Sequence, residues 1–137
     1  MKSRSESLIR LKKFQVDEKR RQVAQIEMMV ADFERMASEL DQQIEIEQQK
    51  TGISDVAHFA YSTFAKAAIA RRDNLLASAH DMKGKLETAQ DDLAEAIEEL
   101  KKIELLDQRE HGRELAADAR AEQADYDEMG RLRHLQR

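Results

Sequence analysis

Hydrophobic residues recur every seven positions, without a break, over the first third of the chain. One set comprises Ile9, Val16, Val23, Val30, Ala37 and Ile44. The set three residues further on is more mixed and comprises Lys12, Lys19, Ile26, Phe33, Leu40 and Glu47. These two sets define the a and d positions of a heptad, and a strict seven-residue repeat is typical of a left-handed coiled coil. The pattern therefore predicts one long helix over about residues 3–50.

A second heptad runs from Ala65 to Ile103 and then becomes polar. Asp107, Glu110 and Glu114 occupy positions where a coiled coil requires apolar side chains. We therefore expect a second helix over about residues 62–130, whose last part has no partner. The predicted fold is all-α, a long antiparallel two-helix coiled-coil hairpin with a C-terminal helical overhang, and residues 1–137 form a single domain.

Residues with special backbone preferences mark the ends of the predicted helices. Ser3 and Glu6 have the S-x-x-E spacing of a capping box at the start of the first helix. Gly52 suits the left-handed position that follows a helix, and residues 51–61 form the predicted tip, including a short helical turn over residues 55–61. Gly84 and Gly112 are expected to be soft points of the second helix, because glycine costs roughly 1 kcal/mol relative to alanine.

The short tip makes the two helices antiparallel neighbours, and it suggests a register. Residues whose numbers sum to about 112 are expected to face each other across the seam. Val30 then faces Met82, and Phe33 faces Ala79. Large side chains thus meet smaller ones, which lets facing layers interdigitate.

Charge is distributed unevenly, although the net charge is only −5. Residues 1–21 hold eight basic and three acidic side chains, whereas residues 85–99 hold one basic and six acidic ones. The predicted register brings these segments together, with Lys12 and Lys13 near Glu98 and Glu99, and Arg20 and Arg21 near Asp91 and Asp92. The basic segment is also suited to nucleic acid or anionic lipid, but few aromatic residues are available for base stacking, and the acidic helix neutralises it. Pairing within the chain is therefore the favoured interpretation.

Little in the composition indicates catalysis. The chain has no cysteine and no proline, and its four histidines form no metal-binding spacing. Neither a phosphate-binding loop nor a nucleophile elbow occurs. The N-terminus lacks the apolar core of a signal peptide, and no stretch is apolar enough to span a membrane. We expect no enzyme activity, no catalytic residue, no cofactor and no metal.

Apolar residues outside the seam are the better candidates for a binding site. Leu8, Leu11 and Phe14 lie at g, c and f positions and form a strip among basic residues. Phe59, Tyr61 and Phe64 lie around the tip. They are expected either to close the tip as a small core or to form a docking patch.

Three segments resemble the FliJ family of flagellar export proteins in its alphaproteobacterial form. They are SLIRLKKFQVDEKRRQVAQIEMMVADFERM near the start, ISDVAHFAYSTFAKAAIARRDNL around the tip, and LAEAIEELKKIE in the second helix. The resemblance covers nearly the whole chain. It implies a soluble, stalk-like coiled coil of the flagellar type III export apparatus, which binds the hexameric export ATPase, the membrane export gate protein and export chaperones.

The resemblance also implies where such partners bind. The ATPase-ring end would comprise Leu8, Leu11, Lys12, Lys13, Phe14, Leu106 and Arg109. The gate-binding face would comprise Tyr61, Phe64 and Ala68. The implied location is the cytoplasm, with peripheral association to the inner membrane through the export apparatus and membrane contact only through partners.

Two other functions remain open from the sequence. A general coiled-coil chaperone or scaffold would use the apolar ends to hold client proteins. A nucleic-acid adaptor would use the basic face and would bind with steep salt dependence; the charge pairing argues against it, and no nucleic-acid partner is expected.

Overall fold

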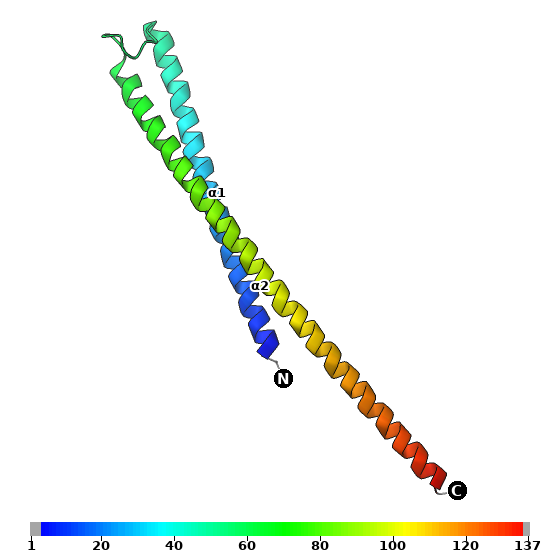
Figure 1. Ribbon diagram of the computed structural model, residues 1–137. Helices are drawn as coiled ribbons and strands as arrows, with labels where there is room; N and C mark the ends of the chain where they lie inside the picture. The colour runs from blue at the N-terminus through cyan, green and yellow to red at the C-terminus, as the bar shows by residue number, and fades with distance from the viewer. Residues whose placement is uncertain (1–3, 136–137) are drawn as a thin grey trace. The chain divides into compact units, whose positions relative to one another are not determined.

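Two long helices make up the protein in a computed structural model that describes residues 4–135. Helix α1 spans Arg4–Thr51 and helix α2 spans Thr63–Leu135, as Figure 1 shows. No strand occurs within this range. The chain divides into two compact units, one of residues 16–95 and one of residues 1–15 and 96–137. The all-α, two-helix fold confirms the prediction.

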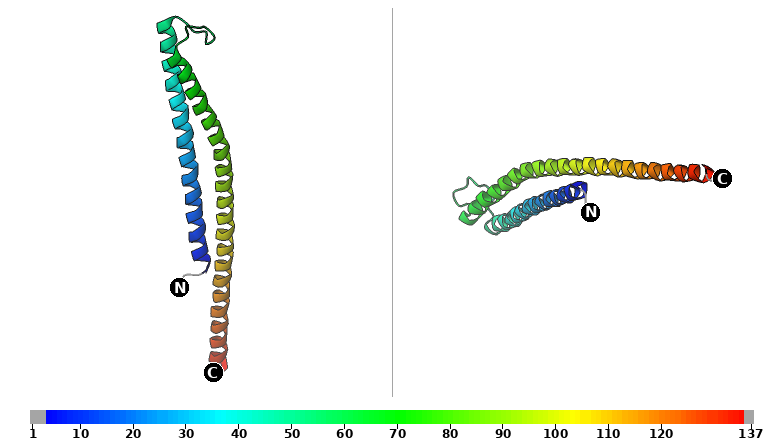
Figure 2. Two further views of the ribbon diagram at one scale, coloured as in Figure 1. Left: turned by 90° about the vertical axis from the view of Figure 1, so that its left-hand side faces the viewer. Right: turned by 90° about the horizontal axis from the view of Figure 1, so that it is seen from below.

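In the unit of residues 16–95, α1 and α2 lie side by side and antiparallel, as Figures 1 and 2 show. The buried residues of α1 are Val16, Val23, Val30, Ala37 and Ile44. All five belong to the predicted set of positions seven apart, so the heptad is the reason that this face of α1 is buried. A fully buried valine contributes about 1.5–3 kcal/mol.

The facing side of α2 is built from small residues. Its buried residues are Ala65, Ala68, Ala79 and Ala89. Leu75, Met82 and Leu86 lie between them along the helix and are half-buried. The branched side chains of α1 therefore pack against a surface of alanines and half-buried long side chains, as the predicted register requires.

Specific caps close the connection between the helices. Gly52 adopts a φ of 73°, and its N–H donates to the carbonyl of Gln48 at 2.9 Å, which confirms the predicted glycine position. The Ser62 hydroxyl accepts a hydrogen bond from the N–H of Ala65 at 3.2 Å, as an N-cap does. The same hydroxyl donates to a carboxylate oxygen of Glu47 at 3.0 Å and so ties the start of α2 to the end of α1.

In the other unit, α2 continues beyond the start of α1, so the contact between the two helices ends at the first turns of α1. The ammonium group of Lys12 lies 3.0 Å from a carboxylate oxygen of Glu99, close to the predicted register. The hydroxyl of Ser5 donates to Glu110 at 3.4 Å. From Gln108 to Leu135 every side chain is exposed. This overhang, residues 108–135, extends for about 40 Å at 1.5 Å per residue.

Some details differ from the sequence prediction. Helix α2 continues past Gly130 to Leu135. Residues 55–61 form turns rather than a helix. Arg20 lies 3.9 Å from Asp17 of its own helix, instead of pairing across the seam. The predicted capping box includes Ser3, which lies outside the described residues.

Candidate functional site

The N-terminal strip comprises Leu8, Leu11 and Phe14, and the structure leaves all three exposed. Their exposed fractions are 41%, 50% and 53%. The three side chains are spaced three residues apart on α1. They lie on the side of the helix away from the seam that Ile9 and Lys12 form with α2. Exposed apolar side chains this close together indicate a protein–protein interface or another apolar contact.

The two lysines beside the strip have different environments. The side chain of Lys12 is 22% exposed and forms the ion pair with Glu99. Its aliphatic stem is thus covered while its charge holds the two helices in register. Lys13 is exposed and has no ion-pair partner among residues 4–135. Of the two, Lys13 is the cation available to a partner.

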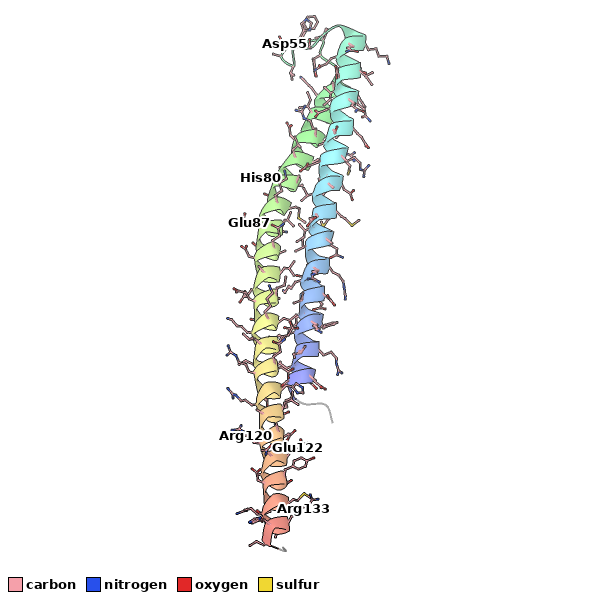
Figure 3. All side chains as sticks on the ribbon, turned by 90° about the vertical axis from the view of Figure 1, so that its right-hand side faces the viewer. Asp55, His80, Glu87, Arg120, Glu122 and Arg133 are labelled. Carbon is pink, nitrogen blue, oxygen red and sulfur yellow. The ribbon has the colours of Figure 1, made fainter. Side chains whose placement is uncertain are left out.

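The C-terminal side of the same unit adds Leu106 and Arg109, both exposed on α2. Sequence reasoning missed Leu105, which is 48% exposed beside Leu106. Figure 3 shows the labelled side chains of Arg120, Glu122 and Arg133 projecting from the overhang. The overhang also exposes large apolar side chains, namely Leu115, Tyr126, Met129, Leu132 and Leu135.

At the tip, the structure separates the three residues that were assigned to one binding face. Tyr61 is 6% exposed, and its hydroxyl accepts a hydrogen bond from the amide of Gln48 at 2.8 Å. Ala68 is likewise 6% exposed, within the interhelical seam. Phe64 is 55% exposed. Tyr61 and Ala68 thus belong to the core of the hairpin, and Phe64 alone of the three has its side chain exposed to solvent.

The connection itself contains the most exposed aromatic ring of the described chain. Phe59 is 96% exposed, and Val56 is 47% exposed. The His58 ring stacks on Phe59 with centroids 4.6 Å apart. The Asp55 carboxylate accepts from the N–H of Ala57 at 3.0 Å, which shapes the turn that presents these residues. The sequence signal for this site is apolar residues placed directly after a turn-forming aspartate.

The unit of residues 16–95 also contains a shallow groove between its helices, which the sequence did not predict. Its volume is about 500 Å³, and it is lined by Glu34, Ala37, Ser38, Asp41, Leu76, Ala79, His80 and Lys83. The small side chains of Ala37 and Ala79 leave the space open. Figure 3 labels His80 on the α2 side of this unit. An open groove of this kind fits a side chain of a partner protein better than an enclosed substrate.

Ion pairs cross between the helices beside the groove. Lys83 lies 2.9 Å from Glu34, and Arg72 lies 2.8 Å from Asp41. Arg72 also lies 3.1 Å from Asp73 of its own helix. Hydrogen bonds to Asp41 and Asp73 raise the pKa of Arg72 above its ordinary value. Because the folded state raises this pKa, the stabilisation is present at every pH below the ordinary arginine value and is lost only above it.

The described residues contain no cluster of metal-binding side chains. Within 4–135, no three His, Asp or Glu side chains come together in a way that would hold a metal ion. Neither α1 nor α2, as far as each is described, has a stretch apolar enough to cross a bilayer.

Comparison with known proteins gives one match. The family model described as the flagellar FliJ protein matches residues 1–137. No curated protein and no solved structure gives a significant match.

Proposed function

We propose that this chain, which belongs to the FliJ family, acts as a stalk-like coiled coil between the export ATPase ring and the membrane export gate. Proteins of this family are components of the flagellar export apparatus, and the family is not a known enzyme family. The unit that contains the N-terminal strip would bind the ATPase ring. The tip of the hairpin would bind the export gate. These contacts would hold the protein in the cytoplasm at the inner membrane.

The exposed N-terminal strip is the observation that supports ring binding best. Leu8, Leu11 and Phe14 are large apolar residues that are absent from the seam and yet lie within one short segment of α1. Leu105 and Leu106 are exposed apolar side chains of α2 in the same unit. Lys13 and Arg109 supply exposed cations, whereas Lys12 contributes by fixing the register against Glu99. A pair of helices with apolar centre and charged rim suits a protein interface.

Support for gate binding comes from exposed aromatic residues. Phe64, which the family resemblance assigns to gate binding, is exposed. Phe59 and Val56 join it, because their side chains have no cover in the hairpin. Buried aromatic anchors dominate binding energy at interfaces, so two exposed phenylalanines are the strongest anchors that this end offers. Tyr61 and Ala68 would act indirectly, by holding the hairpin closed beneath them.

A titration of the export ATPase with this protein tests the ring-binding proposal. We expect the hydrolysis rate to rise at low stoichiometry, and the triple variant Leu8→Ala, Leu11→Ala, Phe14→Ala to lose most of that stimulation. Each truncation at an interface centre costs about 1–2 kcal/mol. The matched control is Met28→Ala, Met29→Ala, Ile46→Ala, which removes three exposed apolar side chains elsewhere on α1.

Circular dichroism must show the same helicity in both triple variants. Equal loss of stimulation in both would contradict a specific role for the N-terminal strip. A wild-type protein that is helical yet leaves the ATPase unchanged would favour the alternative function, a general coiled-coil chaperone or scaffold. The exposed Leu115, Tyr126 and Met129 of the overhang support that alternative, which predicts suppression of client aggregation without any ATPase. Export chaperones would bind the same overhang.

A further inference from the structure

We infer that the outer face of the first part of α1 docks directly on an anionic lipid bilayer. This inference adds a direct lipid contact to a protein whose membrane association was expected only through partner proteins. It concerns residues 4–15, within one compact unit of the chain. It does not depend on the proposed function.

The outer face has the composition of an interfacial helix. At about 100° per residue, an arc of about 160° opposite the seam holds seven residues. They are, in order around the helix, Arg10, Phe14, Ser7, Leu11, Arg4, Gln15 and Leu8. All are exposed except Gln15, which is half-buried. Glu6, the one acidic residue of the segment 4–15, falls outside the arc. Apolar residues flanked by arginines are typical of helices that lie in the bilayer interface.

The arginines of this face are available to lipid headgroups. Arg4 and Arg10 have no ion-pair partner among the described residues, whereas Lys12 on the seam side is paired with Glu99. Lys13 and Glu6 are both exposed and both lie beyond the Arg10 edge of the arc, so the arc itself carries the two arginines. Each cation close to an anionic leaflet raises affinity by roughly fivefold at physiological ionic strength.

The acidic residues of α2 do not cancel this attraction. They lie on the far side of a helix–helix contact, and packed helices are about 8–10 Å apart. That distance is about one Debye length in physiological salt, so the bilayer facing α1 feels the arginines more strongly than the carboxylates behind them. Charge complementarity therefore favours an anionic bilayer as the binding partner of this face. Leu8, Leu11 and Phe14 would supply the apolar contact with the bilayer.

Tryptophan fluorescence gives a direct test, because the chain contains no tryptophan. The full-length Phe14→Trp variant is mixed with vesicles of phosphatidylcholine alone or with about 30% phosphatidylglycerol. We expect a blue shift of the emission with the anionic vesicles only. The control is Tyr126→Trp on the overhang, which should not shift. No shift at position 14, or equal shifts at both positions, would overturn the inference.

Vesicle sedimentation tests the charges separately. The double variant Arg4→Ala, Arg10→Ala is expected to bind anionic vesicles roughly 25-fold more weakly. The control Lys101→Ala, Lys102→Ala removes the same charge from exposed positions of α2 in the same unit and should bind normally. Equal weakening of both variants would show attraction by net charge alone and would overturn docking through this face. Since no ATPase is present, either result leaves the ring-binding proposal untouched.

Discussion

At the scale of single residues, glycine has opposite roles at two positions of this chain. Gly52 adopts a φ of 73°, which an alanine side chain disfavours, and it ends α1. Gly84 lies within α2, and a Cβ added there would meet nothing within 4 Å. The first glycine is thus required by the backbone, whereas the second only weakens the helix.

These roles predict opposite effects of the same substitution. Gly84→Ala should raise the free energy of unfolding by about 1 kcal/mol, because alanine is the better helix former. Gly52→Ala should lower it by about 1 kcal/mol, because the left-handed conformation becomes strained. Urea unfolding followed by circular dichroism measures both. Changes of the same sign would contradict the glycine conformations described above.

Residue roles were the least predictable part of the candidate site. Leu8, Leu11 and Phe14 were predicted to lie outside the seam, and the structure exposes them. Tyr61 and Ala68 were assigned to a binding face, yet both are buried. The heptad starting at Ala65 already places Ala68 at a seam position, so its burial was accessible from the pattern. The Tyr61 position was not, because it follows a connection whose turns have no periodicity.

At the scale of helices, the heptad of α1 determines which face is buried. The five buried residues of α1 are all from one heptad position, although Ala37 is far smaller than its neighbours in the set. Periodicity therefore decides burial here, and side-chain size decides only how closely the helices approach. This explains why the groove beside Ala37 and Ala79 was not predicted, since its volume depends on side-chain packing across two helices.

Removing side-chain volume from the seam should cost far more than removing it from the surface. Val30→Ala deletes two methyl groups at a buried position and should lower the free energy of unfolding by about 2 kcal/mol. The neighbouring Met29 is 44% exposed, so Met29→Ala should change it by less than about 0.5 kcal/mol. Thermal or urea unfolding of the two variants provides the comparison, and similar losses for both would refute the assignment of the seam.

The overhang shows where helix prediction from sequence is limited. Loss of the apolar seam after Ile103 correctly indicated a segment without a partner helix. Helix α2 continues a little beyond the predicted end at about residue 130, because a glycine lowers helix stability by only about 1 kcal/mol and the residues after it are good helix formers. Arg133 and His134 also favour the last turn, since cations interact well with the negative end of the helix dipole.

At the scale of the whole molecule, the two ends of the helices offer different binding chemistry. The N-terminal strip and its neighbours on α1 combine apolar and basic side chains, whereas the connection between the helices presents aromatic and apolar side chains with few charges. A protein with two chemically distinct surfaces can bind two partners without competition between them. The FliJ family assignment places the protein in the flagellar export apparatus.

The hydrogen bonds that join α1 to α2 and to the connection before it have one further consequence, which concerns the order of folding. The bonded residues are separated by 13 positions at Gln48–Tyr61, 31 at Asp41–Arg72, 87 at Lys12–Glu99 and 105 at Ser5–Glu110. Closing a longer loop costs more entropy, by about 0.6 kcal/mol for each doubling. The helices should therefore associate first beside the connection and last at the chain termini.

Refolding kinetics would reveal this order. Tyr61→Phe should slow folding, because its hydrogen bond to Gln48 would form before the rate-limiting barrier, whereas Ile9→Ala should mainly speed unfolding. Stopped-flow circular dichroism measures both rates, and the reverse assignment would contradict zippering from the connection. The chain lacks proline, so no slow prolyl isomerisation should obscure the result. The segment that presents the N-terminal strip would then be the last to order and the first to open.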